Sequence, residues 1–313
     1  MMTRTECARW LLERDNYLIL THRRPDGDTL GSAAALCLGL RKLGKAAHIL
    51  ENIQTTDRYR SLLEGLTAAQ PVPGATVVCV DTASPSLLPD NALPLLEQIQ
   101  LRIDHHGTAT PFTPEALVDP TASSCADILY DVLLEMGVTL DHPMADALYT
   151  AVSTDTGCFR YANTNAHAYL VAAACWQAGG ALYDINQRIF DTNSLAKLKM
   201  QGWMAENTRF FKNRTMAVCA IPKAVEQQIG VTEDDMDSIS GFTRSIEGVQ
   251  LAATLRQLPD GKVKVSMRAV PGMDAAAVCA KFGGGGHKGA AGATLDMDLQ
   301  MAADAVTAAM VSE

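Results

Sequence analysis

The sequence lacks the cysteine spacing of a disulfide-stapled or zinc-stapled protein. Its eight cysteines are scattered along 313 residues, and no two of them form a C-x-x-C pair. A thiolate zinc site or a disulfide framework depends on a recognisable spacing of cysteines. We therefore expect reduced, buried thiols and a cytoplasmic protein.

Positive charge and long apolar runs are also scarce. Lys and Arg number 26 against 35 Asp and Glu, which gives a formal net charge of -9. This balance argues against a partner such as long duplex nucleic acid, which is bound through many Lys and Arg contacts to phosphate. The longest uncharged stretch, residues 161–183, contains polar residues and a Gly pair, and Arg4 and Glu6 interrupt any apolar leader. We expect no membrane span and no secretory signal.

The chain does contain enough apolar residues, 48% of the total, for a full core in each of two domains. In the first half, short apolar runs alternate with helical stretches, which predicts an α/β domain with a parallel sheet. The expected strands cover residues 17–21, 47–50, 76–80 and 101–103, and the expected helices cover residues 31–43, 122–136 and 144–152.

The second half predicts a smaller α+β domain. Its expected strands are residues 215–221, 249–258 and 262–270, and its expected helices are 274–282 and 299–310. The turn at residues 259–261 predicts a hairpin in which Arg256 faces Lys264 and Ala252 faces Arg268. We interpret Arg256 and Lys264 as solvated surface charges. The expected domains are residues 1–190 and 212–313, joined by a helical connector at 191–211, with the active site in a cleft between them.

Acidic and histidine side chains follow three of the expected strands and one expected helix. Parallel strands end at one edge of a sheet, where ligands bind, so these side chains are expected to meet there. A turn or a helix cap explains each residue taken alone, but it does not explain the combination. The set comprises His22, Asp26, Asp28, Asp81, Asp104, His105, His106 and Asp155.

This mixture of carboxylates and imidazoles suits Mn²⁺ or a similar ion better than Ca²⁺ or a thiolate-bound zinc. Six or more ligands are too many for one ion, so we expect two divalent ions, about 3.5–4 Å apart, that share a carboxylate and a water. Asp81, alone at the end of its strand, is the candidate bridge. Such a pair generates hydroxide near neutral pH and neutralises phosphoryl oxygens.

The order and spacing of these residues resemble the four motifs of the DHH phosphoesterase superfamily. The matching motifs are His22-x-x-Pro25-Asp26-x-Asp28-x-x-Gly31-Ser32, then Asp81, then Asp104-His105-His106, then Asp155. The resemblance implies one ion held by His22, Asp26 and Asp81, and a second held by Asp28, Asp81, His105 and Asp155. It also implies that His106 contacts the scissile phosphate as a general acid and that Asp104 orients its neighbours.

A glycine-rich run, residues 283–292, follows an expected helix in the second half. Backbone N–H groups in such a run can approach an anion closely. A flexible linker is the alternative, but the run is short, follows an expected helix and is flanked by His287 and small residues, which argues against it. The run resembles the G-G-G-H-x-x-A-A-G signature of the DHH-associated C-terminal domain. That resemblance implies a substrate-binding loop made of Gly284, Gly285, Gly286 and His287, together with Arg268.

The pair of domains as a whole resembles the nanoRNase/pAp-phosphatase (NrnA-type) branch. The resemblance implies hydrolysis of very short single-stranded RNA, of the 3′-phosphate of pAp, or of pApA and cyclic di-AMP, and it also implies a homodimer. An inorganic pyrophosphatase or exopolyphosphatase is an alternative within the hydrolases. A nucleotide-binding protein without catalytic activity is a third possibility.

Overall fold

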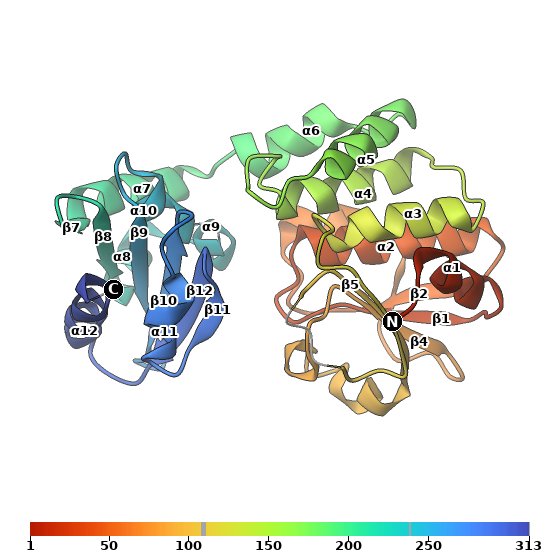
Figure 1. The fold of residues 1–313 in the computed structure, drawn as a ribbon, viewed down its shortest axis with the longest axis horizontal. Helices are drawn as coiled ribbons and strands as arrows, with labels where there is room; N and C mark the ends of the chain where they lie inside the picture. The colour runs from red at the N-terminus through yellow and green to blue at the C-terminus, as the bar shows by residue number, and fades with distance from the viewer. Residues whose placement is uncertain (108–110, 238, 313) are drawn as a thin grey trace. The chain divides into compact units, whose positions relative to one another are not determined.

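The computed structural model describes residues 1–107, 111–237 and 239–312, apart from the side chain of Asp237. The chain forms two compact units, Met1–Thr192 and Asn193–Glu313 (Figure 1). Most of the expected connector, residues 191–211, lies in the second unit, because its helix and a short strand pack there.

The first unit contains a parallel sheet, which the described residues build from six strands in the order β3-β2-β1-β4-β5-β6. The strands are β1 (Tyr17–Leu20), β2 (Ala47–Leu50), β3 (Thr67–Ala68), β4 (Thr76–Val80), β5 (Ile99–Asp104) and β6 (Glu115–Val118). This is the strand order of doubly wound α/β folds, in which the chain reverses its direction of winding between β1 and β4. A ligand site is therefore expected beyond the carboxyl ends of β1 and β4.

Two apolar cores cover the two faces of this sheet. Tyr17 and Ile19 of β1 face the larger core beneath the helices, whereas Leu18 and Leu20 face a smaller core under short 3-10 turns. The helices are α1 (Arg4–Leu12), α2 (Gly27–Lys42), α3 (Cys125–Glu135), α4 (His142–Asp155), α5 (Ala166–Gln177) and α6 (Leu182–Asn186). The short turns are η1 (Asp57–Leu63), η2 (Pro85–Leu87) and η3 (Leu93–Gln98), and η4 (Gln187–Asp191) is a π-turn.

The second unit is a mixed sheet with helices on both faces, in the strand order β11-β12-β10-β9-β8-β7. Its strands are β7 (Arg209–Phe211), β8 (Met216–Ile221), β9 (Leu251–Gln257), β10 (Val263–Ala269), β11 (Gly285–His287) and β12 (Ala290–Leu295). Its helices are α7 (Leu195–Asn207), α8 (Lys223–Ile229), α9 (Glu233–Asp237), α10 (Ser240–Ser245), α11 (Ala275–Ala280) and α12 (Leu299–Val311). The α/β class and the smaller α+β second domain are as predicted from the sequence.

The predicted hairpin register is confirmed. Arg256 pairs with Lys264 and Ala252 with Arg268, and the Leu258 N–H donates to the Lys262 carbonyl. The interpretation of Arg256 as a solvated charge is wrong. Its guanidinium is buried and donates to both carboxylate oxygens of Glu226, at 2.7 and 3.1 Å. Helix α8 brings that carboxylate over the sheet, and the sequence pattern of the hairpin does not reveal it.

The eight cysteines, all within the described residues, are free thiols, and only Cys158 is partly exposed. Within the described ranges, no helix is both long enough and apolar enough to cross a membrane.

Candidate metal centre

The predicted metal ligands lie together at the carboxyl edge of the first sheet. His22 follows β1, Asp81 follows β4, and His105 follows β5, so three adjacent strands each deliver a side chain to the same edge. The N-terminus of α2 carries Asp26 and Asp28, and Asp155 is the last residue of α4. The cluster therefore occupies the point where the sheet reverses its winding.

Asp81 lies at the centre of this cluster, and each oxygen of its carboxylate faces a different histidine. Its Oδ2 is 3.5 Å from His22 Nε2, and its Oδ1 is 3.5 Å from His105 Nε2. The residue is 3% exposed and has a φ of 50°, a left-handed backbone that is strained for a side chain other than glycine. The carboxylate lies at the end of the strand, within 3.5 Å of both His22 Nε2 and His105 Nε2.

Two groups of predicted ligand atoms meet at this carboxylate. His22, Asp26 and Asp81 offer atoms within 4.8 Å of one another, and so do Asp28, His105 and Asp155. A third such group, Asp81, His105 and His106, joins the two. His105 Nε2 lies 3.7 Å from Asp28 Oδ2 and 3.7 Å from Asp155 Oδ2. All six predicted ligands are therefore brought together in two groups, which meet at Asp81.

These separations suit atoms that share an ion better than atoms that share a proton. An N–H···O hydrogen bond spans about 2.7–3.2 Å, which is shorter than the 3.5–3.7 Å between His105 Nε2 and the oxygens around it. Two atoms bound to one ion at about 2.0–2.2 Å each lie about 2.8–3.8 Å apart. Asp81 Oδ1 is buried and accepts no hydrogen bond from the described residues. The donor set thus fits divalent cations.

Helix N-termini hold two of the carboxylates in place. Asp26 caps α2, because its Oδ1 accepts hydrogen bonds from the N–H groups of Asp28 and Thr29. Asp28, fully buried, accepts hydrogen bonds from the N–H groups of Cys125 and Ala126 at the start of α3. The positive end of a helix dipole therefore stabilises each carboxylate before any cation binds.

Two glycines of α2 let α4 approach closely enough to bring Asp155 to Asp28. A Cβ atom on Gly27 would lie 2.4 Å from Thr154 Oγ1, and one on Gly31 would lie 2.3 Å from the Ala147 carbonyl oxygen. Any larger residue at either position would push the two helices apart. The geometry of the second ligand group thus depends on the absence of side chains at these two positions.

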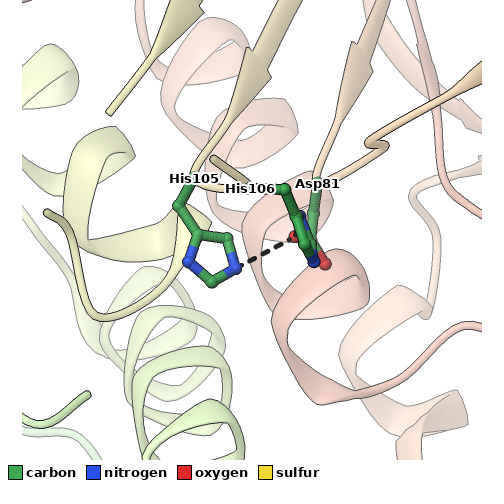
Figure 2. Close-up of side chains that lie close together, drawn as sticks. All are labelled: Asp81, His105 and His106. Atoms are coloured by element: carbon green, nitrogen blue, oxygen red, sulfur yellow. Dashed lines mark ion pairs between the residues drawn. The ribbon is translucent and has the colours of Figure 1, made fainter. Parts of the chain in front are cut away.

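The catalytic candidates His106 and Asp104 lie beside the ligands. Asp104 Oδ1 accepts hydrogen bonds from His106 Nδ1 at 2.8 Å and from the His105 and His106 N–H groups. The His105 and His106 rings lie 4.6 Å apart, and Figure 2 shows both beside Asp81. Because His106 Nδ1 is engaged with Asp104, this nitrogen is a poorer metal ligand than His105 Nε2.

The histidines differ in protonation. Burial lowers the pKa of His105, which favours the neutral imidazole that binds a cation. Burial also opposes protonation of His106, but the hydrogen bond to Asp104 and the charges of Asp81 and Asp104 outweigh it and raise its pKa to about 9. His106 is thus the protonated member of the pair at neutral pH.

The metal-free carboxylates repel one another. Burial, reinforced by the charges of Asp81 and Asp155, raises the pKa of Asp28 well above its ordinary range. Burial and the charges of Asp81 and Asp26 raise the pKa of Asp155 to about 8. The folded chain therefore concentrates negative charge that a bound cation would neutralise.

Sequence reasoning missed two asparagines that orient the cluster. Asn163 Nδ2 donates to Asp155 Oδ2 at 3.2 Å and to the Ser123 carbonyl at 3.0 Å. Asn52 Nδ2 donates to the His22 carbonyl at 2.9 Å. Asn52 lies two residues after β2, as His22 does after β1, so the strand-end rule could have found it. For Asn163, the signal is its closeness to Asp155 in the chain.

The substrate-binding candidates lie in the second unit, away in sequence from the ligands. Arg268 of β10 and His287 of β11 both pair with Ala290 of β12, so their side chains share one face of the sheet. Part of the expected glycine loop is a strand, β11, which pairs with β12. Just before it, Gly284 lies so close to β12 that a Cβ atom there would be 2.2 Å from the Gly292 carbonyl oxygen. A Cβ on Gly285 would meet nothing within 4 Å. The face of β11 that carries the His287 side chain is therefore uncovered at Gly285.

Known proteins share both the motifs and the fold. Residues 16–152 match the DHH family, N-terminal domain, and residues 215–312 match the DHHA1 domain. The chain is 33% identical over 303 residues to the bifunctional oligoribonuclease and PAP phosphatase NrnA of Thermus thermophilus, a match that covers 94% of this chain and 89% of that protein. It is 26% identical to the protein of the same name from Bacillus subtilis, with 93% of each chain covered.

A solved structure shows the same fold over nearly the whole length. The crystal structure of an exopolyphosphatase-related protein from Bacteroides fragilis superimposes with a TM-score of 0.86 at 22% identity, covering 99% of this chain and 96% of that one. The two matched domains and the level of identity to NrnA lead to one conclusion: the chain belongs to the DHH family, in the NrnA-type branch that carries a C-terminal DHHA1 domain.

Proposed function

We propose that this protein is a phosphoesterase, dependent on two divalent ions, that hydrolyses short oligoribonucleotides and removes the 3′-phosphate of pAp. The observation that carries the proposal is the carboxylate of Asp81, whose two oxygens face two separate groups of ligands. A bridging carboxylate between two cations is the arrangement that activates a water for attack on a phosphate ester.

The ligand assignment follows the two groups. His22, Asp26 and Asp81 would hold one ion, and Asp28, Asp81, His105 and Asp155 would hold the other. Mn²⁺ is the proposed ion, because a mixture of carboxylate and imidazole ligands suits it. When bound, the pair of cations would supply a hydroxide near neutral pH and neutralise charge on the phosphoryl oxygens.

His106 is the proposed general acid. In the metal-free chain its pKa is raised to about 9, first through the hydrogen bond to Asp104. Asp104 holds its Nδ1 at 2.8 Å, which leaves Nε2 to donate a proton to the leaving oxygen. Asp104 is fully buried and accepts three hydrogen bonds from the His105–His106 segment, so we assign it the role of orienting both rings.

The second unit supplies the proposed substrate-binding residues. The shared sheet face of Arg268 and His287 offers a guanidinium and an imidazole to a phosphate or a base edge, and Gly285 leaves room for close approach. We assign Gly284 and Gly286 a supporting role, because both are packed against β12.

The substrate class comes from the relatives. Both NrnA relatives are named for oligoribonuclease and PAP phosphatase activity. A formal net charge of -9 fits a small nucleotide held at metal ions better than a long duplex bound through basic residues. Hydrolysis of pApA and of cyclic di-AMP is a further proposed activity of the same centre.

We also propose a homodimer in the cytoplasm. Large apolar side chains are exposed along α5 and α6, namely Tyr169, Leu170, Trp176 and Tyr183. A second copy of the chain would cover such a face. Eight free thiols support a reducing compartment. Light scattering of the purified protein gives its mass, and a monomer that persists at high concentration would rule out the dimer.

The decisive assay compares substrates side by side. Purified protein with Mn²⁺ is given pAp, pApA, cyclic di-AMP and pyrophosphate, and Asp81→Ala serves as control. Turnover of pAp or pApA that the substitution abolishes supports the proposal. Turnover of pyrophosphate alone would indicate a pyrophosphatase, and binding of nucleotides without turnover would indicate a binding protein.

A further inference from the structure

A hollow of about 390 Å³ opens in the first unit beside β2 and β3, outside the metal centre. Its volume falls within the range of about 300–1,000 Å³ that is typical of small-molecule sites. Asn52, Thr55 and Leu63 are buried lining residues, whereas Glu51 and Glu64 are exposed ones. The lining residues lie between the end of β2 and the start of β3, and β2 pairs with β1, whose carboxyl end leads to His22.

Hydrogen bonds join this hollow directly to the metal centre. Asn52, a lining residue, donates through Nδ2 to the His22 carbonyl at 2.9 Å and to Thr21 Oγ1 at 3.1 Å. Strand β2 lies two positions from β4 in the sheet, so with about 4.8 Å between strands the end of β2, which leads to Asn52, is on the order of 10 Å from the end of β4, which leads to Asp81. One or two linked nucleotides span that distance.

The lining favours a neutral group that donates hydrogen bonds. Two carboxylates, Glu51 and Glu64, face one guanidinium, that of Arg60, which is already paired with Asp57. A phosphate would meet net negative charge here and is disfavoured. Thr55 is 8% exposed, and its Oγ1 has no hydrogen-bond partner in the described part of the chain. Such an orphaned hydroxyl is costly unless a ligand satisfies it.

Hydroxyl and amine groups of a nucleoside match this lining. Carboxylates accept hydrogen bonds from ribose hydroxyls and from exocyclic amines of bases, and the 2′-hydroxyl distinguishes RNA from DNA. Thr55 would add a donor and an acceptor at the buried part of the site.

We propose that this hollow is a subsite for the second ribonucleoside of a short RNA, the one joined to the scissile phosphate through its 5′-oxygen, and that Glu51, Glu64 and Thr55 recognise its hydroxyl groups. The inference rests on the proposed function, since it assumes that a phosphate ester is held at the metal centre. It explains how a single centre can handle both pAp, which lacks a second nucleoside, and dinucleotides, which use the subsite.

The test compares substrates that do and do not reach the subsite. Steady-state hydrolysis of pApA, of its 2′-deoxy counterpart and of pAp is measured for the wild type, Glu64→Gln and Thr55→Val. The expected result is a KM for pApA raised about tenfold in each variant, because a hydrogen bond to a charged or buried group is lost. The kcat/KM for pAp stays within about twofold, and the wild-type preference for pApA over the deoxy form shrinks in the variants.

A matched control is Glu97→Gln, which alters an exposed carboxylate on η3 that does not line the hollow. It should leave both substrates unaffected. Equal effects of Glu64→Gln on pApA and pAp, or no effect on either, would overturn the subsite.

A binding measurement separates this proposal from the proposed function. Calorimetry follows a pApA analogue whose scissile ester oxygen is replaced by methylene, added to the Mn²⁺-loaded protein. Binding weakened about tenfold by Glu64→Gln supports the subsite even if the wild type hydrolyses nothing, which would refute only the proposed function. Unchanged affinity would refute the subsite even if the enzyme is active.

Discussion

Asp155 shows how far a ligand's position depends on a residue outside the motifs. Its Oδ2 faces His105 Nε2 at 3.7 Å and accepts a hydrogen bond from Asn163 at 3.2 Å. Asn163 also binds the carbonyls of Asp155 and Ser123, which fixes its amide. Groups that orient a metal ligand affect metal affinity almost as much as the ligand does.

We expect Asn163→Ala to weaken Mn²⁺ binding about tenfold or more, because the Asp155 carboxylate would lose its orienting donor. Isothermal titration calorimetry of the metal-free protein measures the affinity. Asn207→Ala is the control, since Asn207 lies at the end of α7, far in sequence from the ligands, and donates to the Trp203 carbonyl. Equal affinities for wild type and Asn163→Ala would refute the orienting role.

The protonation of single groups sets the pH dependence of the metal-free protein. The pKa of Asp155 rises from 3.8 to about 8, and that of His106 rises from 6.5 to about 9. Both groups therefore bind more protons in the folded chain than in the unfolded one. For both, the stabilising contribution is complete below the unfolded pKa and is lost as the pH rises through the folded pKa.

In EDTA, the melting temperature of the first unit should fall by a few degrees between about pH 6 and about pH 9. Added Mn²⁺ should stabilise the protein more at the higher pH, because its ligands are then deprotonated. Thermal melts followed by circular dichroism across this range check both effects. A melting temperature in EDTA that stays constant or increases with pH would show that repulsion among the carboxylates does not destabilise the metal-free protein.

At the scale of elements, the contact between α2 and α4 determines whether Asp28 and Asp155 meet. Gly31→Ala would place a methyl group 2.3 Å from the Ala147 carbonyl oxygen. We expect a loss of about 1–3 kcal/mol in the free energy of unfolding, as for other overpacked contacts. Denaturant titration measures this loss.

Gly202→Ala is the matched control, since a Cβ on that α7 residue meets nothing within 4 Å. It should stabilise the protein by up to about 1 kcal/mol through helix propensity. If the two substitutions had equal effects, close packing of α2 on α4 would not be what requires glycine at position 31.

Strands that end in a chemical motif could be predicted from the sequence, and short pairing strands could not. The runs before His22 and Asp81 are apolar and buried on both faces, so composition alone marks them as strands. The strand before His105 also contains Gln100 and the buried Arg102, so composition marks it less clearly. Strand β6 is a four-residue edge strand with an exposed Glu115, and β11 is made of Gly285, Gly286 and His287. Their pairing depends on neighbours that only the fold brings near.

The same limit applies to the site. The ligands were predictable because each follows a strand or helix end, and parallel topology gathers such ends. Asn163 orients a ligand across a loop, and the Arg256 guanidinium meets Glu226 of another helix. Contacts of this kind depend on tertiary packing, and no local pattern in the sequence encodes them.

At the scale of the whole molecule, the metal ligands and the proposed substrate-binding residues belong to different units. Metal affinity and substrate affinity should therefore be separable by substitution. Gly285→Ala should raise the KM for pAp while Mn²⁺ affinity stays unchanged, because its methyl group enters open space beside His287 without meeting protein atoms.

Gly284→Ala is the informative comparison. Its methyl group would lie 2.2 Å from the Gly292 carbonyl oxygen, so this variant should lose stability in the second unit. Kinetics and thermal melts of both variants distinguish the two effects. An unchanged KM in Gly285→Ala would exclude close approach of the substrate to the glycine segment.

The central claim is that Asp81 bridges two ions, and electron paramagnetic resonance of the Mn²⁺-loaded protein tests it most directly. Two Mn²⁺ ions that share a carboxylate are magnetically coupled, whereas isolated ions are not. We predict the signal of a coupled pair in the wild type, and only isolated Mn²⁺ in Asp81→Ala. A wild-type spectrum of isolated Mn²⁺ alone, with both ligand groups saturated, would contradict the bridge.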